Sequence, residues 1–345
     1  MSSVGSERVA GAERAVRSAT ARAHPNLALV KYWGKRDEVL VLPHQSSLSL
    51  TLAPLSVTAA VELGVGAGED EVTINGVRAI GQERERVLRM VGRVQAGRPE
   101  LAGAHVVTAG DFPAAAGLAS SAAAFAALAV AARAAAGEKA DARAASILAR
   151  LGSGSASRSV QGGFCAWHRG DRVDGKDSYA EQLFPPSHWP EVRMVVAVVA
   201  KEEKEVKSRD GMRHTVATSP YYGAWVEDAE QEVTRAVNAV RRRDLEELGM
   251  IAERNAWRMH ATALAADPPL CYLKPKTLEV IQAIARLRAQ GVPAWFTLDA
   301  GPNPVVLTDE KSEPTVTALC RGLGADPVVP CSPGGDAELV GELPA

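Results

Sequence analysis

The sequence predicts an α+β protein built from two lobes. Predicted helices and strands are mixed in the way that is typical of the α+β class rather than of a doubly wound sheet. A length of 345 residues exceeds what one ordinary small core organises, so two packed lobes are expected. Hydrophobic residues make up 46% and charged residues 23%, which is the composition of a globular protein and not of a disordered, collagenous or coiled-coil chain.

The N-terminal half is predicted to form a sheet covered by helices. Residues 48–52 alternate at period two, as a strand with one buried face does. Asn75 and Gly76 tolerate positive φ and predict a type I′ turn in a hairpin over 71–80. Apolar residues recur at helical spacing in 82–95, which predicts an amphipathic helix. The other elements expected here are an apolar strand that begins the segment 26–37, strands at 57–63 and 104–108, a helix over 117–136 closed by Gly137, and a helix ending near Arg150.

The C-terminal half is predicted to begin with a central strand. Residues 192–200 form an apolar run that is typical of a buried strand. The proline-rich segment 185–191 is typical of a linker, although such loops also occur within domains. Helices are expected near 222–242, 244–264 and 275–290, and strands near 293–298, 304–307 and 326–329. We assign residues 1–17 to a disordered tail, 18–188 to an N-terminal lobe and 189–345 to a C-terminal lobe.

Charge and cysteine usage exclude several classes of function. Lys and Arg number 39 against 41 Asp and Glu, a net charge of −2, so no overall positive field exists that would hold nucleic acid. The four cysteines form no CxxC pair, which argues against a disulfide framework or a zinc site and favours a reducing, cytoplasmic location. The first seventeen residues lack the apolar block of a signal peptide. The apolar stretch near 114–130 contains two serines, so we expect a buried helix there and no membrane span.

Two segments rich in Gly and Ser are candidate anion sites. Residues 117–121 lead into a predicted helix, whose free N–H groups and dipole favour phosphate. No lysine follows the glycine, so this is not a Walker A loop, and a serine-capped helix is the structural alternative. Residues 152–159 alternate Gly and Ser and contain Arg158, whose planar guanidinium suits a carboxylate or phosphate. A flexible linker has a similar composition.

Three further loops place charged residues at the ends of apolar strands. Residues 26–37 concentrate positive charge in a basic and aromatic turn, which favours an anion site. Asp299 ends an apolar strand and could take a proton from a hydroxyl there. Residues 207–213 again carry cations. The alternatives are a solvated strand end, an Asx turn and an exposed charged loop, respectively.

The histidines give no sign of a metal bound by the protein. None of the seven falls in a HExxH or paired pattern, and no order of Ser, His and Asp suggests a nucleophile elbow. A Mg²⁺ ion carried by a nucleotide stays compatible with the sequence, because such an ion takes most of its ligands from phosphates and water.

Together these segments resemble the mevalonate diphosphate decarboxylase family of the GHMP kinase superfamily. The likeness runs from about Ala19 to Gly335. The segments that recur in that family in the same order are 26–37, 117–123, 152–159 and 299–303. The resemblance implies a ribosomal protein S5 domain 2-like N-terminal lobe, a ferredoxin-like C-terminal lobe, an active site in the cleft between the lobes, and assembly as a homodimer.

The resemblance also implies an activity: ATP-dependent decarboxylation of mevalonate 5-diphosphate to isopentenyl diphosphate in the mevalonate pathway, with Mg²⁺ carried by ATP. Asp299 would orient or deprotonate the 3-hydroxyl, Lys31 would keep Asp299 ionised, and Arg158 would hold the substrate carboxylate. The positions that match the substrate site are Tyr32, Lys35, Ser153, Ser155, Arg158, Arg209 and Met212. The positions that match the ATP phosphate loop are Gly117, Leu118, Ala119, Ser120 and Ser121.

Three positions depart from the family pattern, and rival functions stay open. Gln45 and Asp111 stand where Asn is usual, and Gln161 stands where an aromatic or apolar residue is common. None is a catalytic position, but they leave room for a shifted substrate or nucleotide preference. A decarboxylase of the monophosphate, or a 3-kinase that stops before CO₂ loss, would share the fold and most loops. A non-catalytic ligand-sensing relative should lack the base or the phosphate loop, whereas this chain keeps both Asp299 and the loop.

Overall fold

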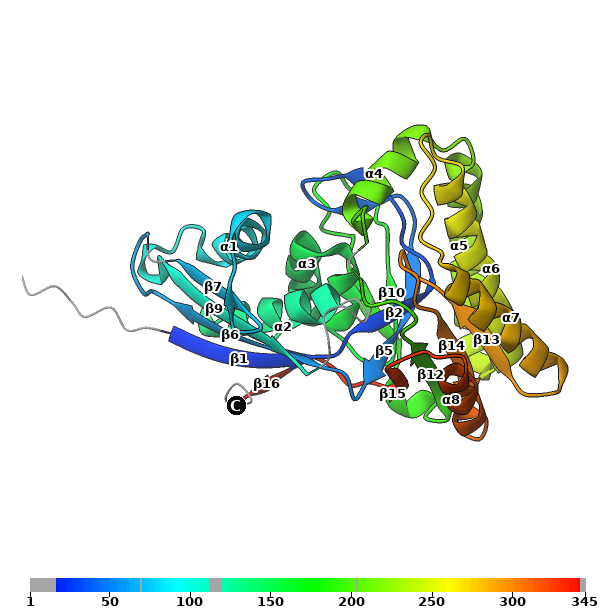
Figure 1. The fold of residues 1–345 in the computed structure, drawn as a ribbon. Coiled ribbons are helices and arrows are strands. Elements are labelled where there is room, and N and C mark those ends of the chain that lie inside the picture. Colours follow the sequence, from blue (N-terminus) through cyan, green and yellow to red (C-terminus); the bar gives the residue numbers. More distant parts are fainter. Residues whose placement is uncertain (1–16, 69, 112–119, 203, 342–345) are drawn as a thin grey trace, which may run out of the picture.

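The computed structural model, which describes residues 17–68, 70–111, 120–202 and 204–341, contains two large sheets, each covered by helices (Figure 1). The strands are β1 (Arg17–Ala23), β2 (Asn26–Val30), β3 (Lys35–Asp37), β4 (Leu42–Pro43), β5 (Ser47–Ala53), β6 (Val57–Leu63), β7 (Glu71–Ile74), β8 (Val77–Arg78), β9 (Ala104–Gly110), β10 (Phe164–Trp167), β11 (Ala180–Phe184), β12 (Val192–Ala197), β13 (Ala294–Thr297), β14 (Val305–Asp309), β15 (Val328–Pro333) and β16 (Glu338–Val340). The helices are α1 (Gly81–Gln95), α2 (Ser120–Ala135), α3 (Ala142–Gly152), α4 (Ser208–Thr218), α5 (Tyr222–Arg242), α6 (Leu245–Leu264), α7 (Pro275–Ala289) and α8 (Glu313–Gly322), with 3₁₀ turns η1 (Pro99–Leu101), η3 (Gly154–Ser159) and η4 (Pro186–His188).

The first sheet has six strands in the order β16-β1-β6-β9-β7-β8. Helices α1, α2 and α3 cover one face of it (Figure 1). The apolar side of α1 enters this core through Val87, Met90, Val91 and Val94, as its helical spacing predicts. Most of α2 is alanine, and the helix is buried along nearly all of its length because small side chains allow close approach on every side.

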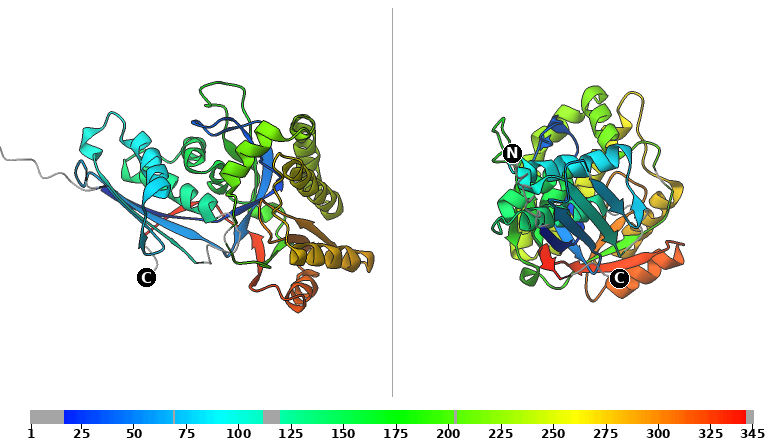
Figure 2. Two further views of the ribbon diagram at one scale, coloured as in Figure 1. Left: turned by 45° about the horizontal axis from the view of Figure 1, so that its top comes forward. Right: turned by 90° about the vertical axis from the view of Figure 1, so that its left-hand side faces the viewer.

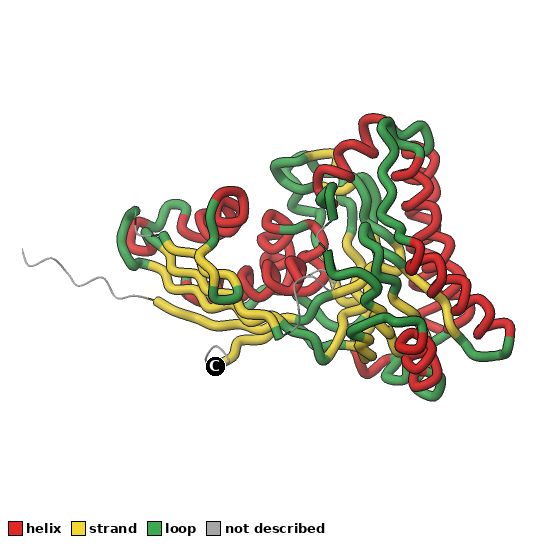
Figure 3. Tube along the Cα trace, in the orientation of Figure 1, coloured by secondary structure: helices red, strands yellow, loops and turns green. Residues whose placement is uncertain are grey.

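The second sheet runs β11-β10-β5-β15-β12-β14-β13, and β2 pairs with β5 beside this path. Helices α5 and α6 pack on one face, with residues such as Ala236 and Ile251 in the same core as the strands. Helices α7 and α8 pack on the other face through Val280 and Val316. Figure 2 and Figure 3 show this lobe with helices outside and strands between them. Because both faces of β12 are covered, its sequence is apolar almost throughout.

The C-terminal end of the described chain returns to the first sheet. After β15, which pairs with β5 and β12, the chain runs to β16, which pairs antiparallel with β1. An Arg22–Glu338 ion pair of 2.6 Å accompanies this contact. Strands from both sides of residue 188 thus share the second sheet, and β16 belongs to the first one. The boundary between residues 188 and 189 stays a prediction.

Most predicted elements are present, with small shifts at their ends. The prediction of a short loop over 207–213 is wrong, because Ser208 begins α4. The hairpin turn has positive φ at both Asn75 (48°) and Gly76 (77°), as a type I′ turn requires. The strand expected over 192–200 ends at Ala197. Val198 N donates to the carbonyl of Pro327, and the N–H groups of Val199 and Ala200 donate to the side chain of Asn303 and not to a strand. Residue 17, which we assign to the tail, is the first residue of β1, and 1–16 lie outside the described residues.

Within the described ranges, no helix is both long and apolar enough to span a lipid bilayer.

Candidate active site

Lys31 and Asp299, which are 268 positions apart, form an ion pair. Lys31 follows β2 and Asp299 lies two residues after β13, and Lys31 Nζ lies 2.6 Å from Asp299 Oδ1. The lysine side chain is only 1% exposed, whereas the carboxylate is 37% exposed. The cation is therefore buried behind an acid that a ligand can still reach.

Burial and two neighbouring charges set the ionisation of Lys31. Burial lowers the pKa of Lys31, because the ammonium has lost its hydration, and the charge of Arg158 lowers it further. The charge and hydrogen bond of Asp299 act in the opposite direction. Lys31 Nζ also donates to the carbonyl of Ala28 at 2.6 Å. Among the described residues, Asp299 is thus the acid whose charge and hydrogen bond favour the protonated form of this buried amine.

Arg158 lies beside this pair, on η3, and is 2% exposed. Its Nη1 donates to Ser47 Oγ at 2.7 Å and its Nε donates to Asn26 Oδ1 at 3.2 Å. Burial lowers the pKa of Arg158 to about 10, and the charge of Asp299 opposes this shift. The guanidinium remains charged at neutral pH, and two hydrogen bonds fix its plane.

The two segments rich in Gly and Ser meet. Residues 153–159 form an ordered, largely buried turn and not a flexible linker. Ser121, in the first turn of α2, lies 3.4 Å from Ser153 between hydroxyl oxygens, and Ser153 lies equally far from Ser155. Three hydroxyls and the start of a helix therefore gather at one place, which suits a phosphate group. Ser120 begins α2, while Gly117, Leu118 and Ala119 lie outside the described residues.

The predicted substrate residues include a polar group, to which Tyr32, Lys35 and Arg209 belong, and the apolar Met212. Tyr32 packs edge-on against Trp167, and its buried hydroxyl has no hydrogen-bond partner in the described part of the chain. Burial raises the pKa of Tyr32, and the charges of Arg158 and Arg209 act in the opposite direction. Lys35 is also nearby, since Arg209 lowers its pKa in addition to burial, and it pairs with Glu38 at 2.7 Å.

Met212 behaves differently from the polar candidates. It is buried in a cluster with Trp33, Tyr222 and Tyr272, among other residues. Its side chain therefore supports the wall of the site through packing, and the structure gives it no polar role.

Two cations that sequence analysis missed also face the site. Lys204 donates hydrogen bonds to the carbonyl of Ala300 and to Ser208 Oγ, and Asp299 influences its pKa, which burial lowers. Arg86 donates to the carbonyl of Gly152 at 2.7 Å. Their sequence neighbourhoods are ordinary charged segments, so no local signal distinguished them.

Arg86 lines a cavity of ≈190 Å³ next to the serines. The lining includes Ser120, Ser121 and Phe125, over which the Arg86 guanidinium lies at 4.8 Å. Burial lowers the pKa of Arg86 to about 10, and repulsion from Arg209 adds to this. The guanidinium of Arg86 and the serine hydroxyls at this cavity together fit the phosphates of a nucleotide.

We expect buried His260 to make the free energy of unfolding depend on pH in the acid range. It is 2% exposed, and burial, aided by the charge of Lys31, lowers its pKa to about 4, while hydrogen bonding to the backbone of Leu298 and Asp299 opposes this. Below the ordinary pKa of about 6.5 the unfolded chain takes up a proton that the folded protein refuses until about 4. The free energy of unfolding should fall by on the order of 3 kcal/mol across that window.

Thermal unfolding from pH 7 to pH 4 measures this effect. The fall of the melting temperature with decreasing pH should become smaller in His260→Gln. It should stay as in wild type in His105→Gln, which changes a partly exposed histidine. Equal slopes in wild type and His260→Gln would contradict the assignment.

Comparison with known proteins gives a consistent result. Family models match both halves: the diphosphomevalonate decarboxylase-like N-terminal domain over residues 23–180, and the mevalonate 5-diphosphate decarboxylase C-terminal domain over 194–325. The diphosphomevalonate decarboxylase of Homo sapiens is 37% identical over 329 residues, which cover 90% of this chain and 82% of that protein.

Two solved structures are similar over nearly their whole length. The mevalonate diphosphate decarboxylase from Staphylococcus aureus has 34% identity and a TM-score of 0.89, covering 95% of this chain and 99% of that one. MDDEF in complex with MVAPP, AMPPCP and magnesium has 38% identity and a TM-score of 0.88, covering 94% and 99%.

The fold is thus the two-lobed GHMP kinase fold, with the ion pair, the arginine and the serines brought together from both halves of the chain. Within that class, the chain belongs to the diphosphomevalonate decarboxylase family.

Proposed function

We propose that the protein uses ATP to decarboxylate mevalonate 5-diphosphate, giving isopentenyl diphosphate, ADP, phosphate and CO₂. The observation that carries this proposal is the Lys31–Asp299 pair, with an accessible carboxylate beside the buried fork of Arg158. Membership of the family and the ligands named for the MDDEF complex support the same reaction.

In the first step, the γ-phosphoryl group of ATP passes to the 3-hydroxyl oxygen of the substrate. Asp299 accepts the hydroxyl proton, and the positive charge of Lys31 keeps the carboxylate ready to do so. Phosphoryl transfer needs mainly positioning and charge neutralisation. The serine hydroxyls and Arg86 bind the ATP phosphates, and Lys204 adds a cation close to Asp299.

In the second step, the C–O bond to the new phosphate breaks, and phosphate leaves with the bonding electrons. The C–C bond between the carboxylate and the adjacent carbon C2 breaks, its electrons form the double bond between C2 and C3, and CO₂ departs. Arg158 holds the carboxylate in line for this cleavage, since its plane is fixed by Asn26 and Ser47. We assign the diphosphate to Tyr32, Lys35 and Arg209, since the charge of Arg209 acts on both of the other groups.

The residues fit a Mg²⁺ ion that arrives with ATP. Among the residues whose positions are described, no three His, Cys, Asp or Glu side chains converge as a metal cage. Mg²⁺ instead takes phosphate oxygens, waters and one or two protein oxygens. Ser121 Oγ, beside Ser153, is a suitable protein ligand at the phosphate seat. When bound, the ion would neutralise phosphate charge.

A coupled assay tests the reaction and separates it from its rivals. Purified protein is given ATP and Mg²⁺ with either mevalonate 5-diphosphate or mevalonate 5-phosphate, and ADP and CO₂ are scored separately. Equal amounts of ADP and CO₂ from the diphosphate are expected. ADP without CO₂ would indicate a 3-kinase, CO₂ from the monophosphate alone would indicate the other decarboxylase, and neither product would favour a ligand sensor.

We also propose a cytoplasmic homodimer. All four cysteines are free thiols, and burial raises the pKa of Cys165 and Cys331 to about 12, which suits a reducing compartment. Light scattering should give about twice the 36.3 kDa chain mass, and a mass equal to one chain would contradict the dimer.

A further inference from the structure

The peptide N–H of Lys31 is bound by a side chain and not by a neighbouring strand. The pairing of β2 with β5 ends at Val30, opposite Leu48. One residue later, Lys31 N donates to Asn255 Oδ1 at 2.7 Å. Asn255 lies on α6 and is fully buried, with 0% exposure. The backbone from which the buried amine extends is thus fixed by an element 224 positions away.

A buried carboxylate fixes the orientation of Asn255. Asn255 Nδ2 donates to Glu232 Oε2 on α5, and Glu232 is 1% exposed. Arg254 Nε and Arg258 Nη1 reach the other carboxylate oxygen of Glu232 at 2.9 and 3.0 Å. Since a carboxylate only accepts and an N–H only donates, a flipped amide would lose both of its hydrogen bonds.

The burial of Glu232 costs free energy of desolvation, so a role for this carboxylate is worth seeking. A buried carboxylate costs several kcal/mol to desolvate, and well-packed apolar residues often replace such groups without loss. Neither proposed chemical step uses Glu232 or Asn255. We propose that Asn255, oriented by Glu232, is a positioning residue that fixes Lys31 against Asp299. This inference rests on the roles proposed above for Lys31 and Asp299.

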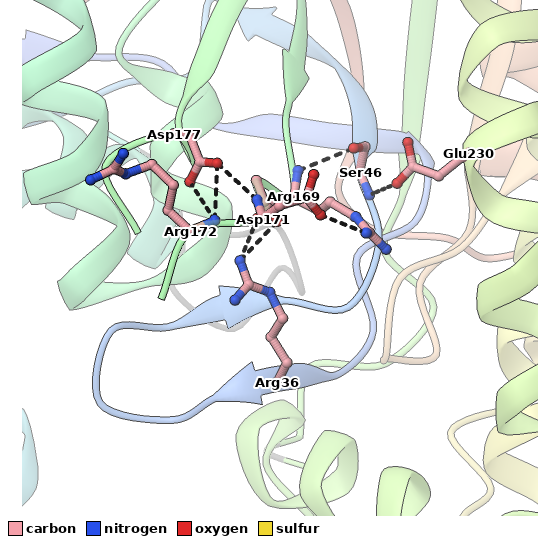
Figure 4. Close-up of polar contacts among 8 residues, drawn as sticks. Arg36, Ser46, Arg169, Asp171, Arg172, Asp177 and Glu230 are labelled. Atoms are coloured by element: carbon pink, nitrogen blue, oxygen red, sulfur yellow. Dashed lines mark hydrogen bonds and ion pairs between the residues drawn. The ribbon is translucent and has the colours of Figure 1, made fainter. Parts of the chain in front are cut away.

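A second contact from the same helix pair has a similar form. Ser46 N, just before β5, donates to Glu230 Oε1 on α5 at 2.7 Å, and Arg169 N donates to Ser46 Oγ (Figure 4). The next residue, Ser47, accepts the hydrogen bond from Arg158. Helix α6 thus supplies an acceptor to the backbone N–H of Lys31, and α5 supplies one to the backbone N–H next to Ser47, the partner of Arg158. Such contacts are expected of a rigid support for a site.

Three variants and a control test the proposal through kcat and KM. Asn255→Leu removes both hydrogen bonds at similar volume, and kcat should fall roughly 10- to 100-fold with KM changed less than about threefold, because small misplacements of reacting groups are costly. Asn255→Asp keeps the acceptor but sets two carboxylates together, and should also lose activity. Adding Glu232→Gln to Asn255→Asp exchanges the amide and the acid, so it should restore most of kcat. The control is Glu227→Gln, at an exposed position of α5, and its kcat should stay within twofold of wild type.

The ionisation of Lys31 gives a readout that does not need turnover. The groups that act on the amine are Asp299, Arg158, His260 and the Ala28 carbonyl. If Asn255→Leu frees the backbone and admits water, the pKa of Lys31 should rise towards its ordinary value, as measured by NMR titration of the labelled amine. The alkaline limb of the kcat profile should move to higher pH with it.

The outcomes separate the two proposals. A wild type that releases no CO₂ counts against the proposed function and leaves the NMR comparison to decide the positioning role. The positioning role is overturned if Asn255→Leu is folded with unchanged kcat and an unchanged Lys31 titration, or if the exchanged pair is folded but no more active than Asn255→Asp. A loss of thermal stability alone, with normal kcat for each folded molecule, also overturns it.

Discussion

Asp299→Asn is expected to bind both ligands and to lose turnover by roughly 10²- to 10⁴-fold, the contribution of a positioned general base. Asparagine keeps the shape of the side chain and can still accept the hydrogen bond from Lys31, which now measures 2.6 Å. It cannot accept the proton of the 3-hydroxyl. The substitution therefore removes the general base and leaves the residues that bind the phosphates and the substrate carboxylate unchanged.

The same variant should alter Lys31. The charge and hydrogen bond of Asp299 raise the pKa of this lysine against the effect of burial. Without that charge, the pKa of Lys31 should fall further and the amine should lose its proton at lower pH. Single-turnover measurements of ADP and CO₂, together with ligand titration, separate binding from chemistry. Asp326→Asn, at an 83% exposed side chain, is the matched control and should stay close to wild type. An unchanged decarboxylation rate in Asp299→Asn would refute Asp299 as the base.

Arg158→Lys is expected to lower kcat/KM on the order of 100-fold, although the charge is kept. Lysine is a point charge on a flexible stem and cannot reproduce a planar fork. The present side chain is held at Nε by Asn26 and at Nη1 by Ser47, and both of these buried contacts would be broken or distorted. A misplaced cation would hold the substrate carboxylate in a poorer orientation, and such a misplacement typically lowers the rate by about 100-fold.

The control for Arg158 is an arginine that only makes a surface pair. Arg172→Lys changes the same group at a 61% exposed side chain paired with Asp174, and should leave the rate within twofold. If Arg158→Lys also lies within twofold of wild type, the assignment of Arg158 to the substrate carboxylate is wrong.

Local patterns predicted much of the fold. The turn at Asn75-Gly76 is required by its own residues, because few others tolerate positive φ. Helix α6 begins at the residue after Asp244, whose side chain accepts from Glu247 N as an N-cap should. Strands β1 and β16 were missed. Strand β1 has no apolar residue larger than alanine, and β16 has only three residues. They pair with each other across the length of the chain, and β1 also pairs with β6, so no local signal identifies them.

The candidate site was predicted where residue type alone restricts the chemistry. A lone acid after a strand and an arginine in a glycine-serine turn are unusual enough to be noticed, and the structure brings them together with Lys31. The supporting contacts could not be predicted in this way. Asn255 and Glu232 lie on helices with ordinary sequences, and their importance appears only when α6 meets the end of β2 across 224 positions.

The most direct measurement of the central idea is a crystal structure with mevalonate 5-diphosphate and a non-hydrolysable ATP analogue. We predict that the substrate 3-hydroxyl lies within hydrogen-bond distance of Asp299, the substrate carboxylate against Arg158, and the triphosphate beside Ser121 and Ser153. Ligands bound elsewhere, for example in the groove of ≈660 Å³ lined by Trp257 and Trp295, would contradict it.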